Sequence, residues 1–310
     1  MKFKKLLLPF LAFIFFSIAS CSSDSENLQK VITDPATENL SSIEYPYAGT
    51  NVLTNSFHTK KYEYDNMKRI NKFNIGGDIY DVTYVSSDMI EINLIDDLMT
   101  GVKAYSKRRL KLKNGNVTNI VDKRFFIRES TSEVFGSQID STAFTYSDSY
   151  LSKIDNYLSD DNGKTFKLQD KFDFQVTGGN ITQVKKTDSF TKNVFIWNYK
   201  YDTNSHINFG DMMLETPFFL AERGRIGIFL NDMLGKKSTN NITSIEYDYS
   251  GVLSYYNDYS YYKNITLKRN LDKFGRLNEI LMSGSVFMNL KDGTTITKTF
   301  SDAKLKLTYK

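Results

Sequence analysis

Short runs of alternating apolar and polar residues fill most of the chain from Tyr45 onward. Residues 61–64, 110–113 and 305–309 are examples, and turn-forming residues such as Asn114 and Gly115 separate such runs. Alternation places successive side chains on opposite faces of a strand, and Asn-Gly tolerates the positive φ angles of a tight hairpin turn. The pattern predicts an all-β fold, an antiparallel meander of hairpins that forms a curved sheet or a soluble barrel-like domain.

One segment, residues 211–237, departs from this alternation. It carries dense apolar clusters that include Phe218, Phe219 and Phe229, and Pro217 together with several glycines prevents one long helix. We expect a long excursion with short helical turns. Two interpretations stay open: the segment fills one end of a barrel, or its three phenylalanines form a lid over a ligand site.

Two short phrases recur along the chain. Asn followed by Val or Ile and then Thr predicts a turn followed by the start of a strand, because Asn tolerates the left-handed region and β-branched residues favour strands. This Asn-(Val/Ile)-Thr phrase begins at Asn116, Asn180, Asn241 and Asn264. The second phrase, Tyr-x-Tyr-Asp, begins at Tyr62 and again at Tyr199.

Tyr-x-Tyr-Asp, followed by a turn and then by Arg or Leu with Ile or Leu, resembles the hairpin of YD (RHS-type) repeats. The stretch from Tyr201 through Pro217 to Thr243 is similar to the end of Bacteroidetes outer-membrane lipoproteins of unknown function. Thr216 stands where those proteins usually have Asn. The resemblance covers residues 60–310 in pattern; it implies a β-rich, curved or barrel-like meander and no known activity.

The first twenty residues have the pattern of a secretion signal. Three lysines within residues 2–5 precede an apolar run at residues 6–16, and two small residues follow at 19–20. The apolar run is short for a transmembrane helix, and a small-residue processing site follows it directly. The pattern therefore predicts a signal peptide at residues 1–20.

The residue after this signal is Cys21, the only cysteine in the chain. Ile18-Ala19-Ser20-Cys21 resembles the lipobox of bacterial lipoproteins, in which cleavage between Ser20 and Cys21 leaves a cysteine that carries diacylglycerol and an added acyl chain such as palmitate. The resemblance implies a lipidated Cys21. The small and polar residues that follow, together with Pro35, predict a flexible tether over residues 21–43, and the alternating runs predict a single β-rich domain over residues 44–310. The resemblance also implies an anchor at the cell outer membrane, facing the periplasm or the cell surface. An ordinary signal with an incidental cysteine is the alternative.

The charge excludes one class of partner. The formal net charge is +4, and removal of the three signal lysines leaves +1. The longest basic run is Lys107-Arg108-Arg109, which is too short for the electrostatic footprint of a nucleic-acid-binding protein. We therefore expect no nucleic-acid partner.

No catalytic or metal-binding motif stands out. The two histidines, His58 and His206, lie near polar residues and are interpreted as loop residues, and too few His and Cys are present for a zinc site. Nucleotide-binding loops and a Gly-x-Ser-x-Gly nucleophile motif are absent from the sequence. We expect no enzyme activity, cofactor or metal, although a hydrolase with spatially paired carboxylates stays open.

A tyrosine-rich stretch supplies the candidate binding residues. They are Tyr247, Tyr249, Tyr255, Tyr256 and Tyr259. Alternation places Tyr247 and Tyr249 on one face of a strand. Exposed, they would stack on sugar rings or on a protein partner; buried, they would be core residues.

These patterns predict a non-catalytic, lipid-anchored cell-envelope protein that binds a glycan or an envelope protein. The alternative is a periplasmic carrier, a barrel or half-barrel that holds a lipid or another apolar ligand. A transmembrane porin is not expected, because outward faces would carry charges such as Lys111, Lys113 and Lys306.

Overall fold

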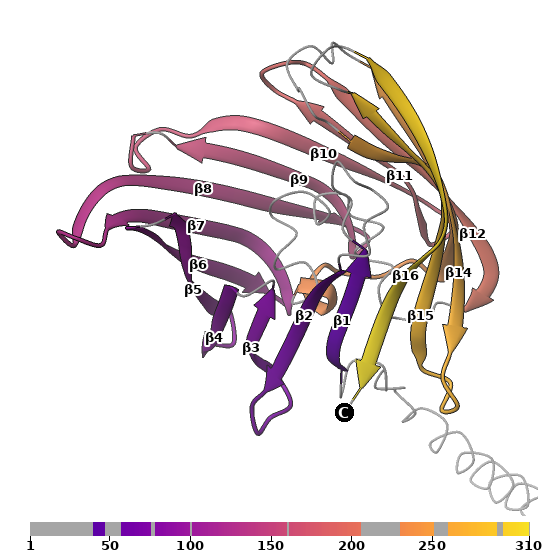
Figure 1. Ribbon diagram of the computed structural model, residues 1–310, viewed down its shortest axis with the longest axis horizontal. Coiled ribbons are helices and arrows are strands. Elements are labelled where there is room, and N and C mark those ends of the chain that lie inside the picture. The colour runs from indigo at the N-terminus through magenta and orange to yellow at the C-terminus, as the bar shows by residue number, and fades with distance from the viewer. Residues whose placement is uncertain are drawn as a thin grey trace, which may run out of the picture.

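The structure is a computed structural model that describes residues 40–46, 57–75, 78–99, 101–159, 161–205, 230–250, 260–289 and 294–309. Within these ranges sixteen strands form one antiparallel sheet that closes into a barrel (Figure 1). Each strand pairs with its neighbours in the chain, and the last strand pairs with the first. The predicted all-β meander and its barrel-like form are confirmed, and the barrel is closed.

The strands are β1 (Leu40–Pro46), β2 (Phe57–Tyr64), β3 (Ile70–Ile75), β4 (Asp78–Ser86), β5 (Met89–Met99), β6 (Val102–Lys113), β7 (Asn116–Arg128), β8 (Glu133–Ser147), β9 (Tyr150–Ser159), β10 (Lys167–Thr177), β11 (Asn180–Asp188), β12 (Val194–Ser205), β13 (Asn240–Ser250), β14 (Ser260–Leu271), β15 (Leu277–Asn289) and β16 (Thr295–Tyr309). A single 3₁₀ turn, η3 (Asn231–Met233), precedes β13.

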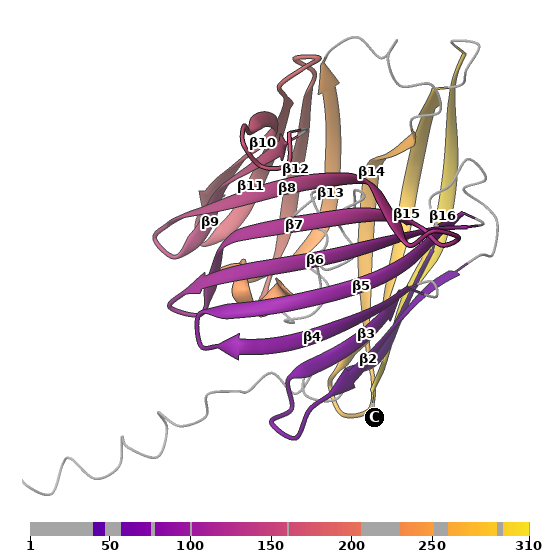
Figure 2. The ribbon, with the colours of Figure 1, turned by 90° about the vertical axis from the view of Figure 1, so that its left-hand side faces the viewer.

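The antiparallel order gives the barrel two different ends. The tight turns β2–β3, β6–β7, β8–β9, β10–β11 and β14–β15 share one end, which we call the turn end, with the start of β1 and the end of β16 (Figures 1 and 2). The opposite end is the rim. Asn114 and Gly115 at the β6–β7 turn have φ angles of 53° and 78°, as the Asn-Gly pair predicts.

Alternation along the strands produces a buried inner face and a polar outer face. In β6, Ala104 and Leu110 are 5% and 0% exposed and belong to the inward set, whereas Arg109 and Lys111 between and beside them are exposed. Buried apolar residues from all sixteen strands join one core cluster inside the barrel. Exposed lysines and glutamates lie on the outer face; they include Lys61, Glu63, Lys111, Lys113, Lys185, Lys268, Lys304 and Lys306.

Tyrosines near the ends of strands tie the hairpins together at the turn end. Each hydroxyl donates a hydrogen bond to a backbone carbonyl at or near the start of the preceding strand, where an apolar residue enters the core. Burial raises the pKa of Tyr64 and of Tyr84 to about 12, helped at Tyr64 by the charge of Asp232 and at Tyr84 by that of Asp65 against an opposing effect of Arg69. The bonds are Tyr64 to Leu40 (2.8 Å), Tyr84 to Ile70 (3.2 Å), Tyr146 to Val117 (2.6 Å), Tyr201 to Ile181 (2.6 Å) and Tyr309 to Leu277 (2.6 Å).

The Asp that follows the Tyr-x-Tyr phrase organises the β2–β3 turn. Asp65 N–H donates to the Arg69 carbonyl at 2.8 Å, and Arg69 Nε donates to Asp65 Oδ2 at 2.9 Å. Asp272 and Arg276 repeat both bonds at 2.8 Å in the β14–β15 turn. The Arg69 guanidinium carbon also lies 4.1 Å from the centre of the Tyr84 ring, which links this turn to the next hairpin.

The Asn-x-Thr phrase marks strand starts in three of its four occurrences. At Asn116, Asn180 and Asn241 the middle residue is fully buried, and the Thr hydroxyl donates to a carbonyl of the partner strand beside a shift in register. The interpretation as a turn is wrong for Asn264, which lies inside β14 with a φ angle of 52°. Gly284 of β15 allows this close approach, because a Cβ there would lie 2.7 Å from the Asn264 carbonyl oxygen.

Residues 230–240, which we call the plug segment, pack into the core at the turn end of the barrel. Leu230 and Leu234 are fully buried in the core cluster. Lys236 N–H donates to the Ser149 carbonyl in the β8–β9 turn at 2.8 Å, and Thr239 N–H donates to the Gly179 carbonyl in the β10–β11 turn at 3.1 Å. This is the end of the predicted excursion over 211–237, and η3 is its described helical turn; Phe218, Phe219 and Phe229 lie outside the described residues.

Two details differ from the sequence-based expectation. β1 begins at Leu40, within the stretch assigned to the tether over 21–43. Leu40 and Ile43 are 2% and 0% exposed, and the polar residues Ser41 and Ser42 between them hide the strand in the sequence. His58 lies in β2 rather than in a loop, and His206 is outside the described ranges.

Candidate functional site

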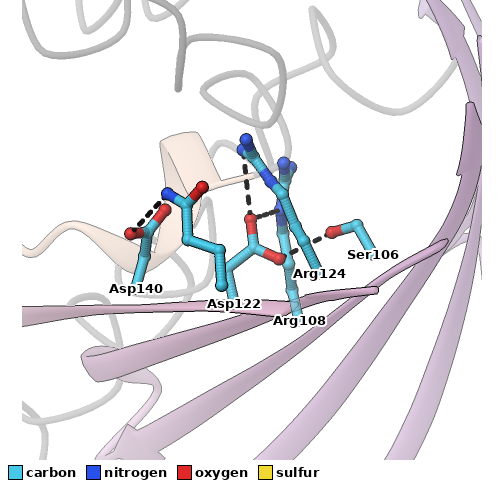
Figure 3. A network of polar contacts seen from close by, with 6 residues as sticks. Ser106, Arg108, Asp122, Arg124 and Asp140 are labelled. Atoms are coloured by element: carbon cyan, nitrogen blue, oxygen red, sulfur yellow. Dashed lines mark hydrogen bonds and ion pairs between the residues drawn. The ribbon is translucent and has the colours of Figure 1, made fainter. Parts of the chain in front are cut away.

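Four polar side chains from β6 and β7 meet on the inward face of the barrel wall (Figure 3). Ser106 Oγ donates to Asp122 Oδ1 at 2.6 Å, and Arg108 Nε donates to Asp122 Oδ2 at 2.9 Å. Arg124 Nη2 lies 3.5 Å from the same Oδ2. One carboxylate is thus shared by a hydroxyl and two guanidinium groups, so the group of four carries one surplus positive charge.

The strand register brings these residues together. Arg108 and Asp122 lie directly opposite each other on β6 and β7, and Ser106 lies opposite Arg124 one inward position nearer the rim. Residues two apart on a strand share a face, so both pairs project into the barrel.

The environment keeps the central carboxylate charged. Burial alone would raise the pKa of Asp122, but the charges of Arg108 and Arg124 and the hydrogen bond from Ser106 outweigh it and lower that pKa. An ionised Asp122 accepts hydrogen bonds and is unsuited to act as a general acid at neutral pH.

Arg108 retains hydrogen-bonding capacity. Arg108 as a whole is 5% exposed, and its Nη1 has no hydrogen-bond partner among the described residues. Its guanidinium carbon lies 5.8 Å from the centre of the Tyr80 ring. A buried donor without an acceptor costs about 1–3 kcal/mol, so an oxygen atom placed here would be bound favourably.

Polar inward positions continue from this group across the wall toward β11. Asp140 lies opposite Asp122 and accepts a hydrogen bond from Gln138 Nε2 at 3.2 Å. Farther along, Lys186 Nζ lies 3.2 Å from Asp170 Oδ1. We call this set the inner polar strip: Ser106, Arg108, Asp122, Arg124, Gln138, Asp140, Thr142, Asn156, Asp170 and Lys186.

An aromatic group adjoins the β11 end of the strip. Lys186 Nζ lies 5.7 Å from the ring centre of Phe195. The Phe195 ring centre is 4.8 Å from that of Tyr249, and the Trp197 ring centre is 5.1 Å from that of Tyr247. These four residues, two on β12 and two on β13, form what we call the aromatic group.

The predicted tyrosines therefore divide into two sets. Tyr247 and Tyr249 lie on one face of β13, as alternation predicts, and that face points inward; Tyr247 is 6% exposed. Burial, together with the charge of Asp188, raises the pKa of Tyr249. The other predicted residues, Tyr255, Tyr256 and Tyr259, lie outside the described residues, as do Ser20 and Cys21.

The sequence did not single out the strip itself. Its signal is a polar residue at an inward position of an alternating strand, as at Ser106 and Arg108 between Ala104 and Leu110. Inward and outward can be told apart only when the buried neighbours are known, so Arg108 looked like part of a surface basic run.

Among the described residues no group of three or more His, Cys, Asp or Glu side chains could hold a metal ion. Within the same ranges, no helix combines the length and the apolar character needed to cross a membrane.

The described fold is a closed sixteen-stranded antiparallel barrel, and a solved structure has a similar fold. A porin-like protein from Bacteroides vulgatus ATCC 8482 is similar with a TM-score of 0.50 and 15% identity, over 87% of this chain and 98% of its own. A porin-like protein from Bacteroides uniformis ATCC 8492 has a TM-score of 0.48 and 11% identity over the same shares. No family profile and no curated protein matches the chain.

Proposed function

We propose that the protein is a lipid-anchored, non-catalytic envelope protein whose barrel binds a glycan on its inner wall. The observation that carries the proposal is the inner polar strip beside the aromatic group. The strip supplies planar hydrogen-bonding groups, and the aromatic rings supply faces on which a sugar ring stacks. Arg124 and Lys186 keep side-chain exposures of 34% and 24%, so both are within reach of water.

The polar side chains on the outer face of the described strands support a barrel that is surrounded by water. Strands of a transmembrane barrel place apolar side chains outward, and a Lys or Arg facing the lipid midplane costs about 2–4 kcal/mol. Here the outward positions of β6 include Lys107, Arg109 and Lys111, whereas the core cluster lies inside. The similarity to porin-like proteins therefore supports the barrel fold in this proposal and does not support a pore function.

A second candidate is the carrier of a lipid or another apolar ligand, and the large apolar core cluster favours it. The plug segment favours the glycan, however, because Leu230 and Leu234 already occupy part of the apolar core at the turn end. In the strip and the aromatic group, the inward groups with remaining exposure include Arg124, Lys186 and Trp197, and these suit a sugar better than an acyl chain.

A non-catalytic role fits the chemistry of the strip. Asp122 and Asp140 lie opposite each other on β7 and β8, so they are a candidate for the kind of carboxylate pair that the sequence left open. Asp122 has a lowered pKa and is held by two arginines, whereas glycoside hydrolysis needs one carboxylic acid with a raised pKa.

Trp197 provides the test of ligand binding. It is the only tryptophan in the chain, so its fluorescence reports on the aromatic group alone. The chain from Ser22 to Lys310 keeps every strand pair of the barrel, since all strands lie within residues 40–309. We expect at least one of a panel of neutral, amino and acidic oligosaccharides to change this fluorescence saturably.

Adjacent lysines on β11 supply a matched pair of variants. Lys186 points inward and pairs with Asp170, whereas Lys185 is exposed on the outer face. K186Q removes one charged hydrogen-bond donor and should weaken binding about tenfold, whereas K185Q should not change it. Equal effects of the two variants, or no response to any oligosaccharide, would reject the inner wall as a glycan site. Lipid that co-purifies with the protein in native mass spectrometry would favour the carrier.

The anchor is tested separately. We expect wild-type protein in cells to fractionate with the outer membrane and to take up labelled palmitate, and C21A to do neither. Uptake of label by C21A would contradict lipidation at Cys21, and it would leave the proposal for the inner wall standing.

A further inference from the structure

The outer face of β6 and β7 carries a concentrated positive charge. Lys107, Arg109, Lys111 and Lys113 occupy successive outward positions of β6, and Lys123 lies outward on β7. Side chains two residues apart on a strand are about 6.6 Å apart. We call these five residues the basic face.

Few described carboxylates neutralise the basic face. Glu91 of β5 pairs with Lys107 at 2.9 Å and with Arg109 at 2.7 Å. Lys111 lies opposite Asn119, and Lys107 lies opposite Lys123. Like charges directly opposite each other destabilise a sheet, so this arrangement favours a partner that brings negative charge.

Exposed apolar side chains continue the same face toward the rim. Tyr105 and Phe125 lie opposite each other on β6 and β7, two residues along from Lys107 and Lys123. Both are 37% exposed, and Ile79 of β4, farther along the same row of the sheet, is 49% exposed. We call these three residues the apolar row.

From these two features we infer that the outer face of β4–β7 docks on an anionic phospholipid surface. The basic face lies against lipid phosphates, and the apolar row lies at the boundary between head groups and acyl chains, where aromatic side chains are favoured. A soluble acidic polymer would form ion pairs with the basic face and would leave Ile79 and Phe125 in contact with water. Figure 2 shows β4 to β8 side by side as one broad surface, which suits a membrane plane.

This docking does not depend on the glycan proposal, because the basic face and the inner polar strip lie on opposite faces of the same strands. It gives the barrel a fixed orientation, lying on its β4–β7 side. A lipid anchor at Cys21 would only raise the local concentration of the barrel at that surface.

The experiment uses the chain from Ser22 to Lys310, which has neither the apolar signal nor the cysteine. Sedimentation with vesicles measures binding to phosphatidylcholine alone and to phosphatidylcholine mixed with phosphatidylglycerol. We expect binding to the mixed vesicles only, and its loss at about 1 M salt, where the Debye length is about 3 Å.

Two triple variants locate the contact. K111Q/K113Q/K123Q removes three exposed lysines of the basic face and spares the residues paired with Glu91. A lysine near an anionic surface contributes about fivefold in binding, so this variant should bind on the order of a hundredfold more weakly. K185Q/K268Q/K306Q removes three exposed lysines on the distant strands β11, β14 and β16 and should bind like wild type. F125S should weaken binding even at low salt.

Three results would overturn the inference. The first is an equal loss in both triple variants, which would mean that net charge alone drives binding. The second is binding to soluble polyglutamate with none to the mixed vesicles, which would identify a soluble polyanion as the partner. The third is equal binding to both kinds of vesicle.

Discussion

Gly235 lies where the plug segment contacts the β8–β9 turn of the barrel. The variant G235A tests whether the plug segment stabilises the fold. Gly235 has a φ of +81°, and a Cβ there would lie 2.4 Å from the Ser149 carbonyl oxygen and 3.0 Å from the Tyr146 ring. Ordinary contact begins at 3.4 Å, so the backbones must separate by about 1 Å. That movement would lengthen the 2.8 Å bond from Lys236 N–H to the same oxygen beyond hydrogen-bonding distance.

Gly115 provides the matched control. Its φ is +78°, and a Cβ there meets nothing within 4 Å, so G115A measures only the left-handed backbone strain. That strain costs about 1–2 kcal/mol, less a few tenths for the reduced entropy of the unfolded chain. G235A adds a lost hydrogen bond of about 1 kcal/mol and part of the roughly 3 kcal/mol that a buried leucine such as Leu234 contributes.

We therefore expect G235A to lower the free energy of unfolding by about 3–4 kcal/mol and G115A by about 1 kcal/mol. Urea titration of residues 22–310, followed by Trp197 fluorescence and by far-ultraviolet circular dichroism, measures both variants. If G235A unfolds within about 0.5 kcal/mol of G115A, the plug segment does not stabilise the barrel as the contacts indicate.

Two further predictions concern titration and the buried charge. Tyr64 and Tyr84 have a folded pKa of about 12, above the ordinary value of 10.0, so the stability that they contribute is complete below pH 10 and is lost as the pH rises toward 12. Ultraviolet titration should show one late-ionising tyrosine fewer in Y84F than in wild type; an unchanged curve would contradict the buried hydroxyl of Tyr84. D122N should cost about 3 kcal/mol in thermal unfolding, because it leaves the Arg108 charge buried without a carboxylate. Exposed D81N should not change the melting temperature, and a similar loss in the two variants would argue against a special role for Asp122.

The fold class could be predicted from the sequence because its signal is local. Alternation in β6 and the Asn114-Gly115 turn specify a hairpin through contacts between near neighbours in the chain. The Tyr-Asp phrase likewise predicts the turn at Asp65, since the aspartate bonds to residues only two to four positions away.

The errors arose where the same local signal has a different tertiary context. Asn264-Ile265-Thr266 has the sequence of a turn and strand start, yet it lies within β14 because Gly284 on the partner strand leaves room for its backbone. The first half of β1, residues 40–43, was assigned to the tether, because only pairing with β16 and β2 shows that it is a strand.

The candidate site could be predicted only in part. Alternation places Tyr247 and Tyr249 on one face, but whether that face points inward depends on Phe195 and Trp197, about fifty residues earlier in the chain. The inner polar strip draws on β6 to β11, so no sequence window contains it.

The sequence by itself thus determined most of the strands and turns and the period of two that separates the faces, because these depend on backbone sterics and on neighbouring residues. Only the tertiary structure decided that the barrel closes, which face is buried, and which charges meet. Closure brings β16 against β1 across the length of the chain. It also places Arg108 inside and Arg109 outside, which gives two consecutive arginines different environments and different roles.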